Sequence, residues 1–375
     1  MKNTMKCIVV FASLALFMIS CSEESPVEQL PALTVPQTYD TAGFAAASKQ
    51  PLLWRASLVN LTNEIKKGRT KGTKLDLAQL NLLFNENGFA ATSTSYYRTI
   101  LETYMQEIVY ASGTEYDPFK TPEQNGQGGV LGAYLFDEKG IEPEQLIEKG
   151  LFGAALYHYA VMQYLTGTIT QEKLHQALVL FGADPSFPNT NTAANTQKPD
   201  IHGALYAARR DNNDGNGFYR SIQKNFRIAQ AALAAGTKYS ADLQNAIKAI
   251  RENWEKALLA TVVNYSYATV DGLKKTNPTP AEIGAALHAY SEGVGFIHGF
   301  KTIPNKIITD AQIDEILTLM LATDPQNVTS YLFVTEPATY LKNFDDIRNK
   351  IKAIYGFSDA DMEAFKKNWI SEQKR

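Results

Sequence analysis

The sequence predicts an all-α protein, built as an irregular bundle of helices. From Pro51 onward, apolar residues recur every three or four positions, which is the spacing of one buried helix face. Two capping boxes mark helix starts, one formed by Thr279 with Glu282 and one by Thr309 with Gln312. No stretch alternates β-branched and polar residues convincingly, and 328–334 comes nearest. We therefore expect helices packed on helices, and we see no fixed repeat that would indicate a solenoid.

The first 20 residues have the three parts of a signal peptide. Lys2 and Lys6 supply the positive start, and 7–19 is almost wholly apolar. That run is shorter than the about 20 residues that a permanent membrane helix needs. Residues 21–35 are acidic, contain prolines and lack an apolar period, so they are predicted to form a tether. Residues 36–375 are predicted to form the helical domain.

The segment Met18-Ile19-Ser20-Cys21 resembles the lipobox of bacterial lipoproteins, with Met where Leu is usual. The resemblance implies that Cys21 carries the lipid and becomes the new N-terminus. The alternative is an ordinary secreted protein with a chance cysteine. Since Cys7 would leave with the signal, the mature chain would have no thiol for a disulfide, a thiolate metal site or a cysteine nucleophile.

The charge balance gives no sign of a nucleic-acid partner. The formal net charge of the chain is -3, and loss of Lys2 and Lys6 makes it more negative. The sequence also lacks a Gly-rich phosphate loop, a nucleophile elbow and a His-Glu-x-x-His motif. We therefore favour a protein that binds a ligand or a partner over an enzyme.

Caps, stops and apolar spacing predict the helices in order. Their expected positions are 58–65 before Gly68, 77–84 after Asp76, 97–108 before Gly113, 143–165, 170–181, 218–235, 241–268, 279–300, 310–322, 340–355 before Gly356, and a short last helix after Ser358. Residues 114–132 are expected to form a long loop. The polar, proline-punctuated stretch 184–200 allows a boundary between two helical halves.

The helix at 279–300 carries the sharpest chemical feature of the chain. Small residues leave it no long polar face, so it should be packed on most sides. His288 and Glu292 are four residues apart on one face and would converge on one divalent metal ion. A complete site would need ligands from another helix, and Glu144, Glu148 and His158 are the nearest in type. The alternative, which we favour, is a buried His hydrogen-bonded to its own carboxylate.

A second candidate lies between 209 and 217. Asn212, Asp214, Asn216 and Gly217 have the spacing of a calcium loop, but Gln223 stands where a bidentate Glu is needed. A tight turn before a helix has the same composition. The adjacent Arg209 and Arg210 would suit an anionic ligand beside Asp211, or would pair with nearby carboxylates.

Several motifs together resemble a family of uncharacterised helical lipoproteins on the outer membrane of Bacteroidetes-type bacteria. They are Glu148-Lys149-Gly150-Leu151-Phe152-Gly153-Ala154, His175-Gln176-Ala177 with Phe181-Gly182, Ala207-Ala208-Arg209-Arg210-Asp211 with Gly215-Asn216-Gly217, Trp254-Glu255-Lys256-Ala257-Leu258, and His288 through Gly293 with Gly295-Phe296. The resemblance covers most of the chain after the tether. It implies an outer-membrane lipoprotein. From the lipobox, the helical prediction and the absence of a complete catalytic set, we favour a non-catalytic protein that binds a small ligand or assists an outer-membrane transporter in uptake of a metal or another nutrient.

The resemblance extends more loosely to the imelysin-like proteins, two-lobed helical bundles connected with metal uptake and, in some members, peptidase activity. Their hallmark is Gly-x-His-x-x-Glu. Here His288 and Glu292 are one residue further apart, and Ala286 stands in the place of the Gly. The alternative function that this likeness implies is a metal-dependent peptidase or metal-binding protein with His288 and Glu292 as ligands.

Overall fold

The computed structural model describes residues 30–191, 197–323 and 328–375. The predicted signal peptide, Cys21 and most of the tether lie outside the described residues and stay predictions. Residues Leu33–Arg375 form one compact unit, and the possible boundary within 184–200 stays a prediction.

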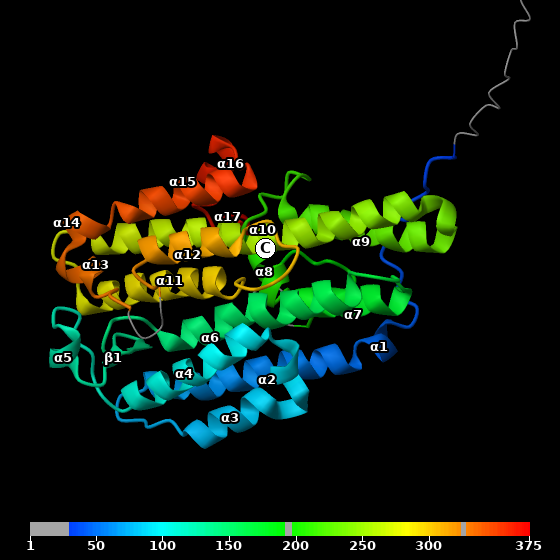
Figure 1. Ribbon diagram of the computed structural model, residues 1–375. Coiled ribbons are helices and arrows are strands. Elements are labelled where there is room, and N and C mark those ends of the chain that lie inside the picture. The colour runs from blue at the N-terminus through cyan, green and yellow to red at the C-terminus, as the bar shows by residue number, and fades with distance from the viewer. Residues whose placement is uncertain (1–29, 192–196, 324–327) are drawn as a thin grey trace, which may run out of the picture. The chain divides into compact units, whose positions relative to one another are not determined.

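The all-α prediction is confirmed (Figure 1). The α-helices are α1 (Phe44–Ala47), α2 (Lys49–Lys66), α3 (Leu77–Asn85), α4 (Ser95–Ala111), α5 (Pro122–Asn125), α6 (Pro143–Leu151), α7 (Gln171–Phe181), α8 (His202–Arg209), α9 (Phe218–Ala235), α10 (Ser240–Leu273), α11 (Pro280–His298), α12 (Asp310–Leu319), α13 (Leu332–Thr335), α14 (Pro337–Tyr340), α15 (Asn343–Tyr355), α16 (Asp359–Ala364) and α17 (Trp369–Gln373). Short 3-10 segments are η1 (Lys67–Arg69), η2 (Glu86–Thr92) and η5 (Thr237–Tyr239), and π-helical segments are η3 (Phe152–Tyr157) and η4 (Ala160–Tyr164).

Five predicted helix starts are confirmed by the hydrogen bonds of their caps. The side chains of Asp76, Thr170 and Thr279 accept backbone N–H groups in the first turns of α3, α7 and α11. The boxes at Thr309 and Ser358 do the same for α12 and α16. Local capping chemistry thus fixes these helix ends, because each cap satisfies N–H groups that have no partner inside the helix.

The expectation of a plain loop over 114–132 is wrong. This stretch contains α5 and the strand β1 (Gly129–Leu131), which pairs antiparallel with β2 (Tyr134–Phe136) in the register Gly129↔Phe136. The stretch 328–334 forms no strand and runs into α13. Strands of three residues are too short to show an alternating pattern, so the sequence could not reveal them.

The helix expected over 143–165 begins as predicted at Pro143 but changes its winding. After α6 it continues as the π-helical segments η3 and η4. A π-turn inserts one residue and rotates the side chains that follow, and such turns occur frequently at functional sites. The spacing of apolar residues over 143–165 hardly differs between an α-helix and a π-helix. It therefore could not predict where the π-helical segments begin.

Helix α11 is buried over most of its length, as its composition predicted. It packs against α6 at glycines: a Cβ on Gly295 would lie 2.5 Å from the Gln145 carbonyl oxygen, and one on Gly299 would lie 2.3 Å from the Gly150 carbonyl oxygen. Only hydrogen atoms fit between the two backbones. This close approach places the polar residues of α6 beside His288 and Glu292.

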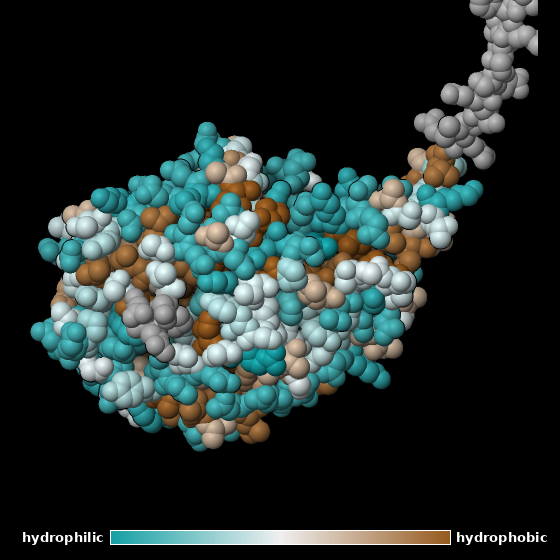
Figure 2. Space-filling model, in the orientation of Figure 1, coloured by the Kyte–Doolittle hydropathy of each residue, from teal (hydrophilic) through white to brown (hydrophobic). Residues whose placement is uncertain are grey.

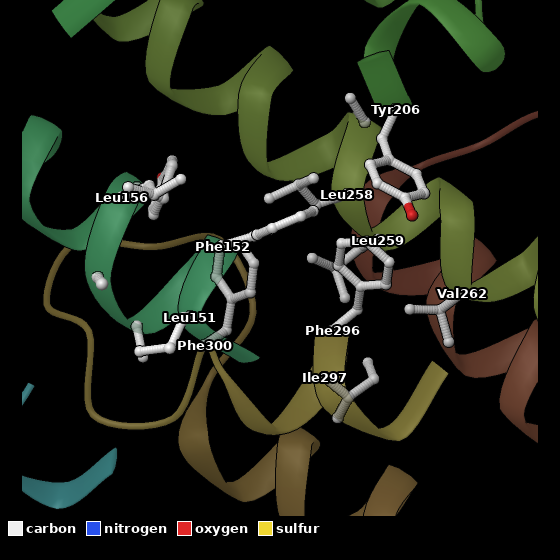
Figure 3. Close-up of a cluster of buried hydrophobic side chains, with 14 of the residues drawn as sticks. Leu151, Phe152, Leu156, Tyr206, Leu258, Leu259, Val262, Phe296, Ile297 and Phe300 are labelled. Carbon is white, nitrogen blue, oxygen red and sulfur yellow. The ribbon is translucent and has the colours of Figure 1, made fainter. Parts of the chain in front are cut away.

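Aromatic side chains join α8, α11 and η3 in the core. The ring centroids of Tyr206 and Phe296 lie 4.9 Å apart, and that of Phe152 lies 5.8 Å from Tyr206 and 6.0 Å from Phe296. Figure 3 shows these rings with the leucines of α10 around them. Burying such rings dominates the energetics of a core.

The outer surface is mainly polar on the face shown in Figure 2, where hydrophobic residues appear in separate patches. Within residues 30–191, 197–323 and 328–375, no helix combines the length and the apolar character that crossing a membrane requires.

Candidate functional site

A pocket of about 620 Å³ brings together α2, η1, α6, α8, α10 and α11. Its walls are strongly polar. The basic side chains that line it are Lys66, Arg69, Lys149, Arg209 and Arg210; the acidic ones are Glu148 and Glu292; the imidazoles are those of His202 and His288. The residues that the sequence singled out on α11 and around 209 therefore meet in one cavity, together with residues that the sequence analysis did not connect to them.

Acidic and basic side chains alternate around a closed ring of contacts in one wall of the pocket. The ring runs Lys66, Glu148, Lys149, Glu292, His288, Glu142, Arg69, Glu144 and back to Lys66, with nitrogen–oxygen distances from 2.6 to 3.9 Å. Each carboxylate thus lies between two basic groups. Buried charges are tolerated when they are paired and hydrogen-bonded in this way.

The imidazole of His288 has a neighbour at Nδ1, one on its ring face and one near Nε2. Its Nδ1 lies 2.6 Å from Oε2 of Glu142, a fully buried carboxylate that also accepts from Arg69 Nη2 at 2.9 Å. The Tyr134 ring stacks on the imidazole with centroids 4.1 Å apart, and the Arg69 guanidinium lies 5.0 Å from the centre of the Tyr134 ring. Because an ionised carboxylate only accepts, Nδ1 carries the hydrogen. The other ring nitrogen, Nε2, is left beside Glu292.

Lys149 connects the two carboxylates that line the pocket. Its Nζ lies 2.7 Å from Oε2 of Glu148 and 3.3 Å from Oε1 of Glu292. Burial alone would raise the pKa of Glu148, but the charges of Lys149 and Lys66 outweigh it and lower that pKa to about 2. Burial would likewise lower the pKa of Lys149, yet Glu148 and the other acidic neighbours raise it well above its ordinary value. The Glu148–Lys149 pair is therefore fully ionised at neutral pH.

Arg209 and Arg210 lie in the same pocket outside this ring. Arg209 lies over the Tyr206 ring at 4.9 Å, and Arg210 donates from Nη1 to the Phe365 carbonyl at 2.7 Å. In the described part of the chain neither guanidinium forms an ion pair with a carboxylate, and the buried Nε of Arg210 has no hydrogen-bond partner. Burial lowers the pKa of Arg210 to about 10. Burial opposes the charge of Arg209, but Tyr206, Tyr265 and Glu292 together raise its pKa above the ordinary value. Two adjacent guanidinium groups thus line the pocket without a carboxylate in direct contact.

His202 is a lining residue that the sequence analysis missed. It begins α8 with a φ of 48°, a left-handed conformation that is uncommon for a residue with a side chain. Burial, and then the charge of Arg55, lower its pKa to about 3, so the imidazole is neutral. Backbone strain of this kind clusters at functional sites, where the surrounding structure must hold it in place.

The structure brings together only some of the side chains that the predicted metal site requires. His288 and Glu292 do share a face, with Nε2 and Oε2 3.6 Å apart, and Glu148 and Glu144 lie in the same charge ring. His158 does not join them, because its Nδ1 bonds to the Thr92 carbonyl. Among the described residues, no three His, Cys, Asp or Glu side chains are grouped in a way that would hold a metal ion.

The calcium-loop residues form a chain of tight turns. Asp214 N donates to Asn212 Oδ1, and Asn216 N donates to Asp214 Oδ1. Asp211 is fully buried and accepts from Asn213 N and from Arg220 N in the first turn of α9. These oxygens are used as turn and cap acceptors, as the alternative interpretation held. The structure places Arg209 and Arg210 in the pocket but uses Asp211 to cap α9.

Comparisons of the chain with protein-family models, with curated proteins and with solved structures found no match.

Proposed function

We propose that this chain is a lipid-anchored protein of the bacterial outer membrane, whose helical domain binds a small anionic solute and serves its uptake. One observation carries the binding part: the Arg209–Arg210 pair lines a pocket in which every other basic side chain already has a carboxylate partner. An anion entering the pocket would replace the missing counter-charge. The planar guanidinium group suits carboxylates and phosphates because two of its N–H groups can donate in parallel.

The volume of the pocket agrees with a small solute. Its about 620 Å³ lie within the about 300–1,000 Å³ that small-molecule sites occupy. The lining side chains come from helices that the core fixes, so the site is formed before the ligand arrives. No nucleophile activated by a base lines the pocket among the described residues, and we propose binding as the function in preference to catalysis.

The binding proposal predicts that small anions stabilise the protein and that Arg209→Gln removes the effect. At about 10 mM, an anion with a Kd of about 1 mM would raise the free energy of unfolding by about 1.4 kcal/mol. Thermal unfolding and titration calorimetry with sodium acetate, citrate, phosphate and D-glucuronate would measure this at constant ionic strength. We expect at least one anion to stabilise the wild type, and Arg209→Gln to weaken its binding by about tenfold or more.

Arg251→Gln is the matched control, because Arg251 lines a separate cavity of about 410 Å³. Its affinity for the anion should equal that of the wild type. Arg209→Lys should bind with intermediate affinity, since it keeps the charge but loses the planar fork. If no anion stabilises the wild type more than sodium chloride does, or if Arg251→Gln loses as much affinity as Arg209→Gln, the proposal fails.

The anchoring part of the proposal depends on Cys21. In a Gram-negative host, Cys21→Ser should abolish incorporation of a fatty-acid label and move the protein from the membrane fraction to the soluble fraction. Mass spectrometry of the mature protein should find an acylated N-terminus at residue 21. A wild-type chain without acyl groups would contradict the anchoring and leave the binding experiments unaffected.

The metal-dependent alternative stays a prediction that elemental analysis separates from anion binding. Catalytic zinc usually has three protein ligands. Here Nδ1 of His288 is taken by Glu142, and Nε2 with Oε2 of Glu292 supplies two. Stoichiometric zinc or iron in the purified protein, lost in His288→Gln, would favour the alternative.

A further inference from the structure

We propose that the solute is a hydroxylated carboxylic acid of the sugar-acid class, with its carboxylate on Arg209 and Arg210 and its hydroxyl groups on Glu292 and His288. This inference rests on the proposed function and adds to it the chemistry at the other end of the pocket. It can fail while the pocket still binds anions.

The two carboxylates that line the pocket are poor partners for a second cation. Glu148 and Glu292 flank Lys149 at 2.7 and 3.3 Å, so their charge is already largely balanced. A ligand ammonium group would have to compete with Lys149 and would be repelled by it. Their remaining lone pairs can still accept hydrogen bonds from neutral O–H groups. The acidic wall therefore favours hydroxyl groups over a positively charged group.

The contact between His288 and Glu292 leaves a place for one such hydroxyl. Nε2 and Oε2 are 3.6 Å apart, beyond the distance of a good direct hydrogen bond, and both residues line the pocket. An O–H group within reach of both atoms has one hydrogen to donate, and either Oε2 of Glu292 or Nε2 of His288 accepts it. The position of the imidazole is fixed, because Glu142 holds its Nδ1 and Tyr134 stacks on its face.

Two tyrosine hydroxyls extend this polar wall. Tyr265 OH lies 3.4 Å from Tyr206 OH, which lies 3.5 Å from Oε1 of Glu292. Both distances are at the long end for hydroxyl hydrogen bonds, so these groups keep the capacity for better partners. Arg209 lies against the same Tyr206 ring. The tyrosines thus connect the acid-binding arginines to the hydroxyl-binding wall, as a solute with one carboxylate and several hydroxyls requires.

A set of matched six-carbon ligands tests the inference on the wild-type protein. D-Glucuronate carries a carboxylate and hydroxyls, hexanoate the carboxylate alone, D-glucose the hydroxyls alone, and 6-aminohexanoate a carboxylate with an ammonium group. Titration calorimetry should give D-glucuronate an affinity about tenfold or more above each of the other three. D-Glucose 6-phosphate tests whether a phosphate replaces the carboxylate.

Equal binding of hexanoate and D-glucuronate would overturn the sugar-acid inference and leave anion binding in place. Tighter binding of 6-aminohexanoate or of D-glucose 6-phosphate would also overturn it, in favour of a zwitterion or of a phosphate ester. Binding of none of these acids would end the sugar-acid inference, and would end the anion-binding proposal only if acetate, citrate and phosphate also fail to bind.

Two variants test which residues bind the hydroxyl groups and which bind the carboxylate. Glu292→Gln removes a negative charge near Arg209 and so should shift the affinity for both acids, but it should reduce the preference for D-glucuronate over hexanoate by about threefold or more. Arg209→Gln should weaken both acids by the same factor. If Glu292→Gln leaves that preference intact, the hydroxyls do not lie on Glu292 and the inference is wrong. Circular dichroism and thermal unfolding of each variant establish that it is folded.

Discussion

Gly295→Ala is expected to lower the free energy of unfolding by about 3 kcal/mol, the upper part of the range for adding a methyl group to a packed interior. The added Cβ would lie 2.5 Å from the Gln145 carbonyl oxygen and 3.0 Å from Cβ of Lys149. The nearest of these atoms is backbone, so relief requires α6 and α11 to move apart. Urea or thermal unfolding, with the slope of the transition compared, measures the loss.

Gly293 supplies the control on the same helix. A Cβ at Gly293 would meet its nearest neighbour, a Met320 side-chain atom, at 3.7 Å, which is an ordinary contact. Gly293→Ala should therefore leave stability unchanged or raise it by up to about 1 kcal/mol, because alanine favours the helix over glycine. Equal losses in the two variants would show that helix propensity, and not the contact between α6 and α11, governs these positions.

For α11, the sequence predicted the helix and its start but not its contact with α6. The glycines and alanines indicated a helix packed on most sides, and the capping box at Thr279 fixed its start. Both signals are local. The identity of the neighbour was not predictable, since Gly299 meets Gly150 across a separation in sequence that no helical period encodes.

In the candidate site, too, contacts between residues distant in the sequence could not be predicted. His288 and Glu292 were found from their spacing, and Arg209 and Arg210 from their charge. The partner that orients His288 is Glu142, 146 residues away, and the sequence around Glu142 shows only a residue before a helix-starting proline. Glu148 was named only as a possible metal ligand by its type, and its pairing with Lys149 was not predicted. Charges that pair through tertiary contacts can be recognised only when the helices that carry them have been placed.

In the turn at 212–216, by contrast, the sequence pattern suggested a ligand site where the side chains instead bond to the local backbone. Asn212, Asp214 and Asn216 matched a ligand spacing, yet the side-chain oxygens of Asn212 and Asp214 accept backbone N–H groups two residues on. Short polar side chains satisfy their own backbone first when a tight turn offers the geometry. A spacing that lacks its last, bidentate ligand is therefore weak support for calcium, and the Gln at 223 was the informative residue: its Oε1 accepts from Arg220.

Lys149→Met is expected to be the most disruptive single change in the pocket, with a loss of about 3–5 kcal/mol of stability, because it leaves two carboxylates without their shared cation. Met has a similar length, so packing changes little. Anion binding should fall as well, since Glu148 and Glu292 then present uncompensated negative charge beside Arg209. Chemical denaturation and calorimetry with D-glucuronate measure the two effects. A loss below about 1 kcal/mol would contradict the assignment of Lys149 as the charge that holds this wall together.

The dependence of this loss on pH identifies its cause. The pKa of Glu148 is lowered from 4.5 to about 2, so its ionised form stabilises the fold above about pH 4.5, and this contribution disappears as the pH falls toward 2. Lys149, whose pKa is raised, stays charged over the whole interval. The difference in stability between wild type and Lys149→Met should therefore be largest above pH 4.5 and shrink below it.

Adding Glu148→Gln and Glu292→Gln to Lys149→Met should recover much of the loss at neutral pH, because a neutral wall no longer needs the cation. No recovery in the triple variant, with a loss that does not depend on pH, would indicate that packing, and not charge, makes Lys149 necessary.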